Sequence, residues 1–288
     1  MGKILHVTSG DIAGASLAKS GVPGEVFVWH DILYDGPRQP GWPDQAVLEA
    51  RAAFLEGTTG GGLNRRYVLT TLREQYAKLA RAADYNRLVL WFDACLFDQA
   101  MLCHILALLP ETERARAELL CVDAFPGIEP YHGLGQLGPE QMAGVYGQRR
   151  PVAEEQFAFA GQVDRAFARQ DQAAFKELAA LSEAPLPWVP AAVARWLAER
   201  PDPASGLGRL EELALAAVRD GCRAPAEIFR QVAARETPPQ YWGDVTLWQK
   251  INGLADREPP LVRIEGPRTR LPQWGGIADL KLFRVFPD

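Results

Sequence analysis

The sequence predicts an α/β fold: a Rossmann-like, mostly parallel sheet with helices on both faces, followed by a helical region and a winged-helix-like C-terminal module. Strand-like and helix-like segments alternate through the first 150 residues, which is typical of parallel sheets whose crossovers are helices. Residues 87–92 (RLVLWF) are a continuous apolar run, as expected of a central strand buried on both faces. Near the C-terminus, three helical stretches precede two strand-like segments, which is the element order of a winged helix.

Apolar spacing and the turn and cap residues predict the elements of the first domain. In order, they are a strand at 3–8, a short helix from Asp11 to Leu17, a strand at 25–29, a proline-rich loop at 30–43, a helix capped by Asp44, a helix with apolar residues from Val68 to Leu79, the strand at 87–92, a helix at 99–109 and a strand at 118–122.

The composition changes after about residue 150, where Ala, Phe and Leu become frequent. The later elements are two helices within 153–182, a proline-started helix that carries Trp188 and Trp196, a linker at 201–208, helices at 208–219, 225–235 and 244–256, and the strand-like segments LVRIEG and KLFRVF. We therefore expect an α/β domain over residues 1–150, a helical connecting region over 151–204 and the winged-helix-like module over 205–288.

Composition limits the function classes. Hydrophobic residues make up 48% of the 288 residues and charged residues 23%, as in ordinary globular proteins. The net charge of −5 gives the molecule no general attraction for phosphate backbones, so a nucleic-acid partner is not favoured. No run approaches the ~20 apolar residues of a membrane span. The start MGKILHVTSGD lacks the apolar core of a signal peptide, and the four cysteines are scattered without a CxxC pair, so we expect a cytoplasmic protein with reduced thiols.

Polar side chains follow every predicted strand of the first domain. Because parallel strands place their carboxyl ends at one edge, where open α/β sheets bind ligands, these side chains are expected to gather there. The expected ligand-binding residues are Ser9, Gly10, Asp11, Gly36, Asp98, Gln99 and His132. The expected catalytic residues are Asp31 or Asp35 as a base or metal ligand, with His30 or His132 as a proton shuttle. The alternative is that these carboxylates only cap helices and start turns, for which Asp11 and Asp98 are well placed.

Other motifs are weak or missing. The turn at residues 9–16 (SGDIAGAS) has neither GxGxxG nor GxxxxGK[ST], and its acidic residue disfavours a phosphate. The glycine-rich segment at 131–142 is either a functional loop or a disordered surface loop. No zinc-binding histidine spacing and no GxSxG motif occurs, and His6 and His104 are expected in the core. The sequence identifies no cofactor.

The C-terminal module is a candidate interaction module. Its third helix, at 244–256, has Thr246, Gln249, Lys250 and Asn252 as candidate outward residues. From Ser205 onward there are twelve Lys or Arg and eleven Asp or Glu, which is not the basic footprint of a DNA-binding domain. Trp242 and Trp248 favour packing or a contact with a protein partner.

Four strings occur in fixed order within residues 3–145: HVTSGD, WHDILYDGP, LWFDACLFDQAML and FPGIEPYHGLGQL. They resemble the bacterial domain-of-unknown-function 1835 family, and the string from LEELALAAVRDG to PLVRIEG resembles the tail that accompanies this domain in many relatives. The family pattern maps onto Gly10, Asp11, Trp29, Asp31, Leu33, Gly36, Pro37, Trp91, Asp98, Gln99 and the glycines of 133–138. Where relatives often carry a second acidic or His residue, this chain has Asp93-Ala94-Cys95. The resemblance implies membership but no activity.

Two function classes follow. The leading hypothesis is that the sheet edge binds a small polar or phosphorylated ligand, with a hydrolase or transferase reaction as its extension. The alternative is a regulatory or adaptor protein without enzymatic activity, whose C-terminal module contacts a protein or, less favoured, DNA.

Overall fold

The computed structural model describes residues 2–274 and 277–288. Within these residues, five strands form one sheet in the order β2-β1-β3-β4-β5. Their bounds are β1 Ile4–Ser9, β2 Glu25–Trp29, β3 Arg87–Asp93, β4 Ala117–Val122 and β5 Arg150–Pro151. The first four strands are parallel, and β5 runs antiparallel to β4. The prediction of a mostly parallel α/β sheet is therefore confirmed.

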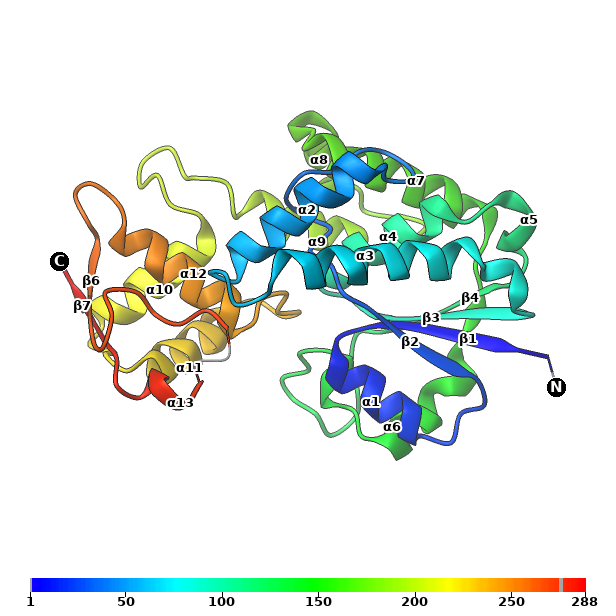
Figure 1. Cartoon of the computed structure of the whole chain (residues 1–288), viewed down its shortest axis with the longest axis horizontal. Helices are drawn as coiled ribbons and strands as arrows, with labels where there is room; N and C mark the ends of the chain where they lie inside the picture. The colour runs from blue at the N-terminus through cyan, green and yellow to red at the C-terminus, as the bar shows by residue number, and fades with distance from the viewer. Residues whose placement is uncertain (1, 275–276) are drawn as a thin grey trace.

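Helices cover both faces of this sheet (Figure 1). On one face lie α1 (Asp11–Lys19) and α6 (Pro139–Val145), and on the other lie α3 (Arg65–Ala80), α4 (Leu96–Leu108) and α7 (Glu154–Arg169). Successive side chains of a strand point to opposite faces. In β3, Val89 and Trp91 pack with α1 and α6, whereas Leu90 and Phe92 belong to the core of the opposite face. The unbroken apolar run in β3 reflects this burial on two sides.

Local capping and spacing explain where several helices begin. Asp44 caps α2 (Gln45–Thr58), because its carboxylate accepts a hydrogen bond from the Val47 backbone N–H. In α3, the buried face runs from Val68 to Leu79 at helical spacing, as predicted. Asp171 caps α8 (Gln172–Ala179) directly after α7 ends. The shorter elements of the first 150 residues are η1 Ala82–Asp84, α5 Glu111–Arg114, η2 Leu134–Gln136 and η3 Tyr146–Gln148.

The helices that follow residue 150 share the core of the sheet domain. Both α7 and α9 (Val189–Leu197) pack against α4. Phe157, Val163 and Phe167 of α7 are buried in the same cluster as Leu90 and Phe92 of β3. The segment expected as a connecting region therefore forms an outer layer over α4. The segment expected as a linker, 201–208, folds back on itself through a hydrogen bond from Asp202 N to the Leu207 carbonyl.

The C-terminal part contains the predicted helices and strands. They are α10 Arg209–Arg219, α11 Pro225–Arg235, α12 Asp244–Ala255, β6 Val262–Glu265 and β7 Arg284–Pro287, with β6 and β7 paired antiparallel. A further short helix, α13 Ile277–Leu280, was not predicted. Trp242 and Trp248 are buried against Phe229, with 3% and 4% of their surface exposed. They are therefore core residues of this part and present no open aromatic surface to a protein partner.

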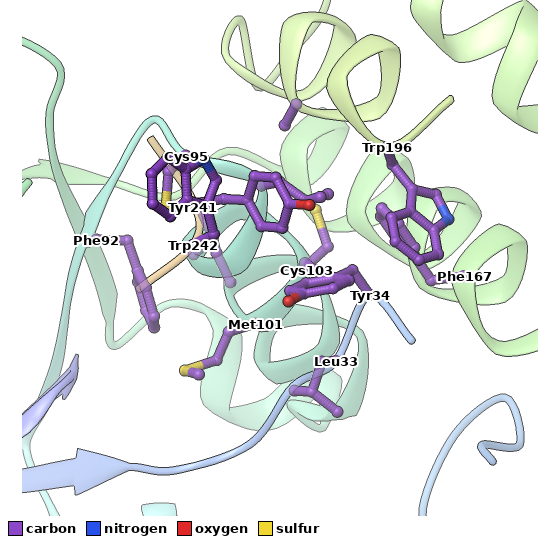
Figure 2. Packing of buried hydrophobic residues seen from close by; sticks show 14 of the residues in the cluster. Leu33, Tyr34, Phe92, Cys95, Met101, Cys103, Phe167, Trp196, Tyr241 and Trp242 are labelled. Atoms are coloured by element: carbon purple, nitrogen blue, oxygen red, sulfur yellow. The ribbon is translucent and has the colours of Figure 1, made fainter. Parts of the chain in front are cut away.

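Contacts join the C-terminal part to the sheet domain. The ring of Tyr34, in the loop after β2, lies 5.2 Å from Trp196 and 5.4 Å from Tyr241 (Figure 2). Gln273 Nε2 donates a hydrogen bond to the Thr58 carbonyl at 2.7 Å. One hydrophobic cluster runs from β1 to β7, so the parts form a continuous core.

Two expectations about individual residue types can be compared with the structure. His6 and His104 are buried and hydrogen-bonded, as expected: His6 contacts Trp91 Nε1, and His104 contacts Tyr76 and Asp164. The four cysteines are free thiols.

In the part of the chain that the structure describes, none of the helices has both the length and the apolar composition that crossing a bilayer requires.

Candidate functional site

The candidate site lies where the order of the strands reverses. From β1 the chain goes to β2 on one side, and it then crosses to β3 on the other side of β1. At such a point the connections after neighbouring strands diverge and leave a crevice beyond their carboxyl ends. Ser9 ends β1, and Asp93 ends β3. The sheet topology therefore brings together two of the polar strand ends that the sequence singles out.

The Asp98 carboxylate connects the two strand ends, because it accepts a hydrogen bond from each. Ser9 Oγ donates to Asp98 Oδ1 at 2.5 Å, and the Asp93 backbone N–H donates to Asp98 Oδ2 at 2.7 Å. Asp98 lies in the first turn of α4, which begins directly after β3. Gln99 Nε2 donates to the Asp93 carbonyl at 2.6 Å, so the start of α4 is held tightly against the end of β3. These side chains are almost fully buried.

Burial changes the acidity of this carboxylate pair. It raises the pKa of Asp98 well above the usual range, and the nearby charge of Asp93 raises it further. Burial also raises the pKa of Asp93, although hydrogen bonds from Cys95 oppose this shift. The pKa of the Cys95 thiol is raised by burial and then by Asp93 and Asp98, so the thiol keeps its proton. The pair therefore retains a proton to higher pH than free carboxyl groups do.

A glycine-rich loop covers Asp93. Gly133 has φ +143°, and a Cβ atom at this position would overlap with Asp93 Oδ2. Leu134 and Leu137 are buried and anchor the loop in the core beside α6. The segment 131–142 is thus an ordered structural element of the site, with η2 and the start of α6 inside it. The predicted alternative of a disordered surface loop does not apply.

Two adjoining pockets open at this edge. The first, here called the acidic pocket, has a volume of about 630 Å³ and is lined by strand ends, by the 132–136 loop and by the segment before α12. Its polar and aromatic lining includes Ser9, Asp11, Tyr34, Asp93, Asp98, His132, Gln136, Tyr241, Asp244 and Thr246. Among the described residues, no Lys or Arg lines it.

The second, here called the apolar pocket, has a volume of about 340 Å³. Most of its wall is hydrophobic and comes from Trp29, Ile32, Leu55, Leu63, Val68, Phe97 and Trp274. It shares Gly10, Asp11, Ile32, Phe97, Val245 and Thr246 with the acidic pocket. The two pockets therefore form one cleft between the sheet edge and α12, within the size range of small-molecule sites.

The start of α1 faces the acidic pocket. Gly10 has φ +74° and no side chain that can cap the helix. The first helical bond joins Gly14 N to the Gly10 carbonyl, so the N–H groups of the three preceding residues have no acceptor within the helix. Those residues, Asp11, Ile12 and Ala13, all line the pocket. Backbone donors and the positive end of the helix dipole are thus available there.

The expected residues occupy the cleft only in part. Ser9, Gly10, Asp11, Asp98 and His132 line the acidic pocket, and His30 lines the apolar pocket. His30 Nε2 lies 2.8 Å from Asp11 Oδ1 in an exposed pair at the rim. Gln99 supports the site from behind through its bond to the Asp93 carbonyl.

Asp31 is bound in a buried ion pair. Arg51 donates to its carboxylate through Nε at 3.0 Å and through Nη2 at 2.5 Å. Arg51 also donates to the carbonyls of Ile32, Asp35 and Pro37, and so it holds the loop after β2 in place. Asp31 also lines the apolar pocket, and its carboxylate is already engaged there by the Arg51 guanidinium in charge-assisted hydrogen bonds.

Asp35 and Gly36 lie outside the cleft. Asp35 Oδ1 accepts a hydrogen bond from Gly36 N at 2.7 Å, which stabilises a turn. A Cβ atom at position 36 would lie 2.6 Å from the Phe54 ring, so this glycine permits close packing on α2. Neither residue lines either pocket. Asp35, expected as a base, and Gly36, expected as a ligand contact, therefore lie apart from the pocket-lining residues, and the contacts they make are a turn and close packing.

The third C-terminal helix, α12, faces the cleft. Thr246 and Gln249, expected to point outward, line the apolar pocket. Asn252 is fully buried and exchanges hydrogen bonds with Leu271, as donor at 3.0 Å and as acceptor at 2.7 Å. Of the expected set, only Gln249 is exposed, whereas Thr246 and Lys250 are half-buried. The face that was expected to meet a partner is therefore largely used within the chain.

Sequence reasoning missed the residues that complete the cleft. Tyr241, Asp244 and Trp274 come from parts of the chain far from the strands, and no local pattern signals their approach, whereas Tyr34 lies in the loop after β2. The signal for Asp93 was present, because it directly follows the clearest buried strand. Asp93, Cys95 and Asp98 offer ligand atoms within 4.8 Å of one another, but both carboxylates already accept hydrogen bonds, and we assign them no metal.

No family model matches the sequence, and no curated protein matches it with significance.

Proposed function

We propose that this protein binds a small polar molecule, neutral or positively charged, in the cleft between the sheet edge and α12. One observation carries the proposal: Asp11, Asp93, Asp98 and Asp244 line the acidic pocket, and no described Lys or Arg does. An anionic group would meet like charges there without a neutralising cation, whereas hydroxyl, amide and ammonium donors would find acceptors. The phosphorylated alternative of the sequence prediction is therefore the less favoured one.

The finer fold and family assignments are part of this proposal. The strand order, with the reversal beside β1, supports a Rossmann-like description of the first domain. Three helices followed by an antiparallel pair support a winged-helix-like description of the tail. We also propose membership in the domain-of-unknown-function 1835 family, on the strings quoted above. These assignments carry no activity.

A thermal-shift screen with matched ligand pairs tests the proposal. Each pair contains a neutral or amine-bearing compound and its phosphorylated counterpart, for example a nucleoside with its nucleotide and a sugar with its sugar phosphate. A ligand that binds only the folded state at about 100 times its Kd adds ~2.7 kcal/mol of stability. In a chain of this size, that corresponds to an increase in Tm of several degrees. We expect the increase with unphosphorylated members.

Asp244→Asn and Asp256→Asn provide the matched variants, since the two residues lie at opposite ends of α12. Asp244 lines the acidic pocket, whereas Asp256 pairs with Arg270 away from it. The shift should shrink in Asp244→Asn and persist in Asp256→Asn. Shifts caused only by phosphorylated compounds, or shifts of equal size in both variants, would contradict the proposed ligand class.

A further inference from the structure

Resting on the proposed ligand cleft, we propose that Ser9 is the nucleophile of an acyl-transfer or ester-hydrolysis reaction, with Asp98 as its base. A serine hydroxyl becomes an effective nucleophile when a neighbouring group accepts its proton. Ser9 Oγ donates to Asp98 Oδ1 at 2.5 Å, and both residues line the acidic pocket. Nucleophile and base therefore lie in hydrogen-bonding contact at the wall of a pocket that can admit a substrate.

The base is held in a fixed orientation. The Asp93 N–H donates to Asp98 Oδ2, which leaves Oδ1 directed at Ser9. The Asp93 backbone N–H therefore positions the Asp98 carboxylate, as the third member of a catalytic triad positions its base. Burial raises the pKa of Asp98, and this makes its ionised form a stronger base. The groups that face it are Ser9 from β1, Asp93 at the end of β3, Cys95 just after β3, and Tyr131 and Cys121 from the β4 side.

The start of α1 supplies the second requirement of acyl transfer. Attack on a carbonyl group places negative charge on its oxygen, and backbone N–H groups stabilise this charge when they are fixed in advance. The uncapped N–H groups of Asp11, Ile12 and Ala13 follow Ser9 by two to four positions and line the same pocket. Gly10 leaves the approach to them free of a side chain.

The reaction balances with water as the second substrate. Ser9 Oγ forms a bond to the acyl carbon while its proton passes to Asp98 Oδ1. The carbon–leaving-group bond then breaks, and the leaving group takes the proton from Asp98. Water attacks the acyl-serine by the same route: its proton goes to Asp98, the bond to Ser9 Oγ breaks, and Oγ recovers the proton.

The two pockets define the substrate class. The acidic pocket, with no described Lys or Arg in its wall, disfavours an anionic group next to the reacting carbonyl. The adjoining apolar pocket, lined by Trp29, Leu55 and Phe97, suits a hydrophobic acyl or alcohol part. The proposed substrate is therefore an uncharged or cationic ester with one apolar side.

Labelling with a fluorophosphonate tests the nucleophile without knowledge of the substrate. In this probe, Ser9 Oγ forms a bond to phosphorus as fluoride leaves. Intact-mass and peptide mass spectrometry should find one adduct, on Ser9, in the folded protein and none in the denatured protein. Ser9→Ala should abolish the adduct, and Asp98→Asn should slow labelling by roughly 100-fold, which is the size of a general-base contribution.

Ser16→Ala is the control, because Ser16 lies on α1 but lines neither pocket of the cleft. Its labelling should equal that of the unmodified chain, and circular dichroism should show that all variants are folded. Absence of an adduct, or an adduct that persists in Ser9→Ala, overturns the assignment. A ligand-induced increase in Tm in protein that is not labelled would overturn the nucleophile alone and leave the ligand cleft intact.

Discussion

At the scale of single residues, the pair Asp93–Asp98 is the least conventional feature of the chain. Two carboxylates are buried side by side, and in the described residues none of their hydrogen-bond partners is cationic. Asp164 provides a contrast, because Arg38 and His104 contact its carboxylate. Burial opposes the charge of Asp164, but these partners outweigh it and lower the pKa. Neutralising Asp98 should therefore raise the free energy of unfolding at neutral pH, whereas neutralising Asp164 should lower it.

Asp98→Asn is predicted to raise the free energy of unfolding at neutral pH. The folded state of the natural chain binds the Asp98 proton more tightly than the unfolded state, so stability falls as pH rises from about 3.9 through the raised pKa. Each pKa unit corresponds to about 1.4 kcal/mol. Asn removes this cost, and its advantage should vanish below about pH 4. Urea unfolding at several pH values measures the difference.

Asp164→Asn is the paired variant with the opposite expectation. Because the pKa of Asp164 is lowered in the folded state, its contribution to the free energy of unfolding is present above the ordinary carboxyl pKa. This contribution is lost as pH falls through the lowered pKa. This variant should lose stability at neutral pH. A uniform loss of stability in Asp98→Asn at every pH would show that the lost acceptor atom outweighs the charge, which contradicts the account of the pair.

At the scale of elements, the loop after β2 depends on one ion pair. Arg51 and Asp31 are almost fully buried, and Arg51 also binds three carbonyls of the loop. Asp31→Ala should cost about 3–5 kcal/mol, because it leaves a buried guanidinium without its partner. The exposed pair Arg81–Asp84 is the control, and Asp84→Ala should cost about 0–1 kcal/mol. Thermal unfolding that shows equal costs would refute the structural role of Asp31.

The loop over Asp93 depends on Gly133. Gly133→Ala combines an unfavourable φ with a clash against Asp93 Oδ2, so we expect a loss of about 1–3 kcal/mol. Gly135→Ala should change stability by no more than about 0.5 kcal/mol, since its nearest neighbour is Ile12 at 3.9 Å. Fluorophosphonate labelling of both variants reports the shape of the pocket. Equal stability and equal labelling of the two variants would mean that the loop does not pack against the Asp93 carboxylate.

Some of these elements could be predicted from the sequence. The run 87–92, the cap at Asp44 and the apolar spacing of α3 are local signals, and their predicted elements match those observed. Convergence of Ser9 and Asp98 follows from parallel strands alone, because each strand ends at the same edge.

Other features depend on tertiary contacts that no local pattern records. The partner of Asp31 is Arg51, on a helix twenty positions later, and Arg51 resembles any surface arginine in the sequence. The 240–246 segment closes the cleft only because α12 packs beside α2. The ion pair of Asp31 and the packing of α12 against the sheet domain are therefore features that the sequence does not reveal.

At the scale of the whole molecule, the cleft is formed jointly by distant parts of the chain. Tyr34 packs on Tyr241, Gln273 binds the Thr58 carbonyl, and one hydrophobic cluster runs through all three expected parts. We predict a single cooperative unfolding transition, with equal calorimetric and van't Hoff enthalpies. Differential scanning calorimetry measures both. Two separated transitions would show that the C-terminal part folds apart from the sheet domain.

The central claim is that the cleft between the sheet edge and α12 is the ligand site, and crystal soaking with a library of small fragments tests it most directly. The account predicts that neutral and amine-bearing fragments gather in the acidic pocket, within hydrogen-bonding distance of Asp98, Asp244 or Thr246, with their apolar parts toward Trp29. A cleft that stays empty while fragments occupy other surfaces would contradict the account, as would a cleft that prefers phosphate-bearing fragments.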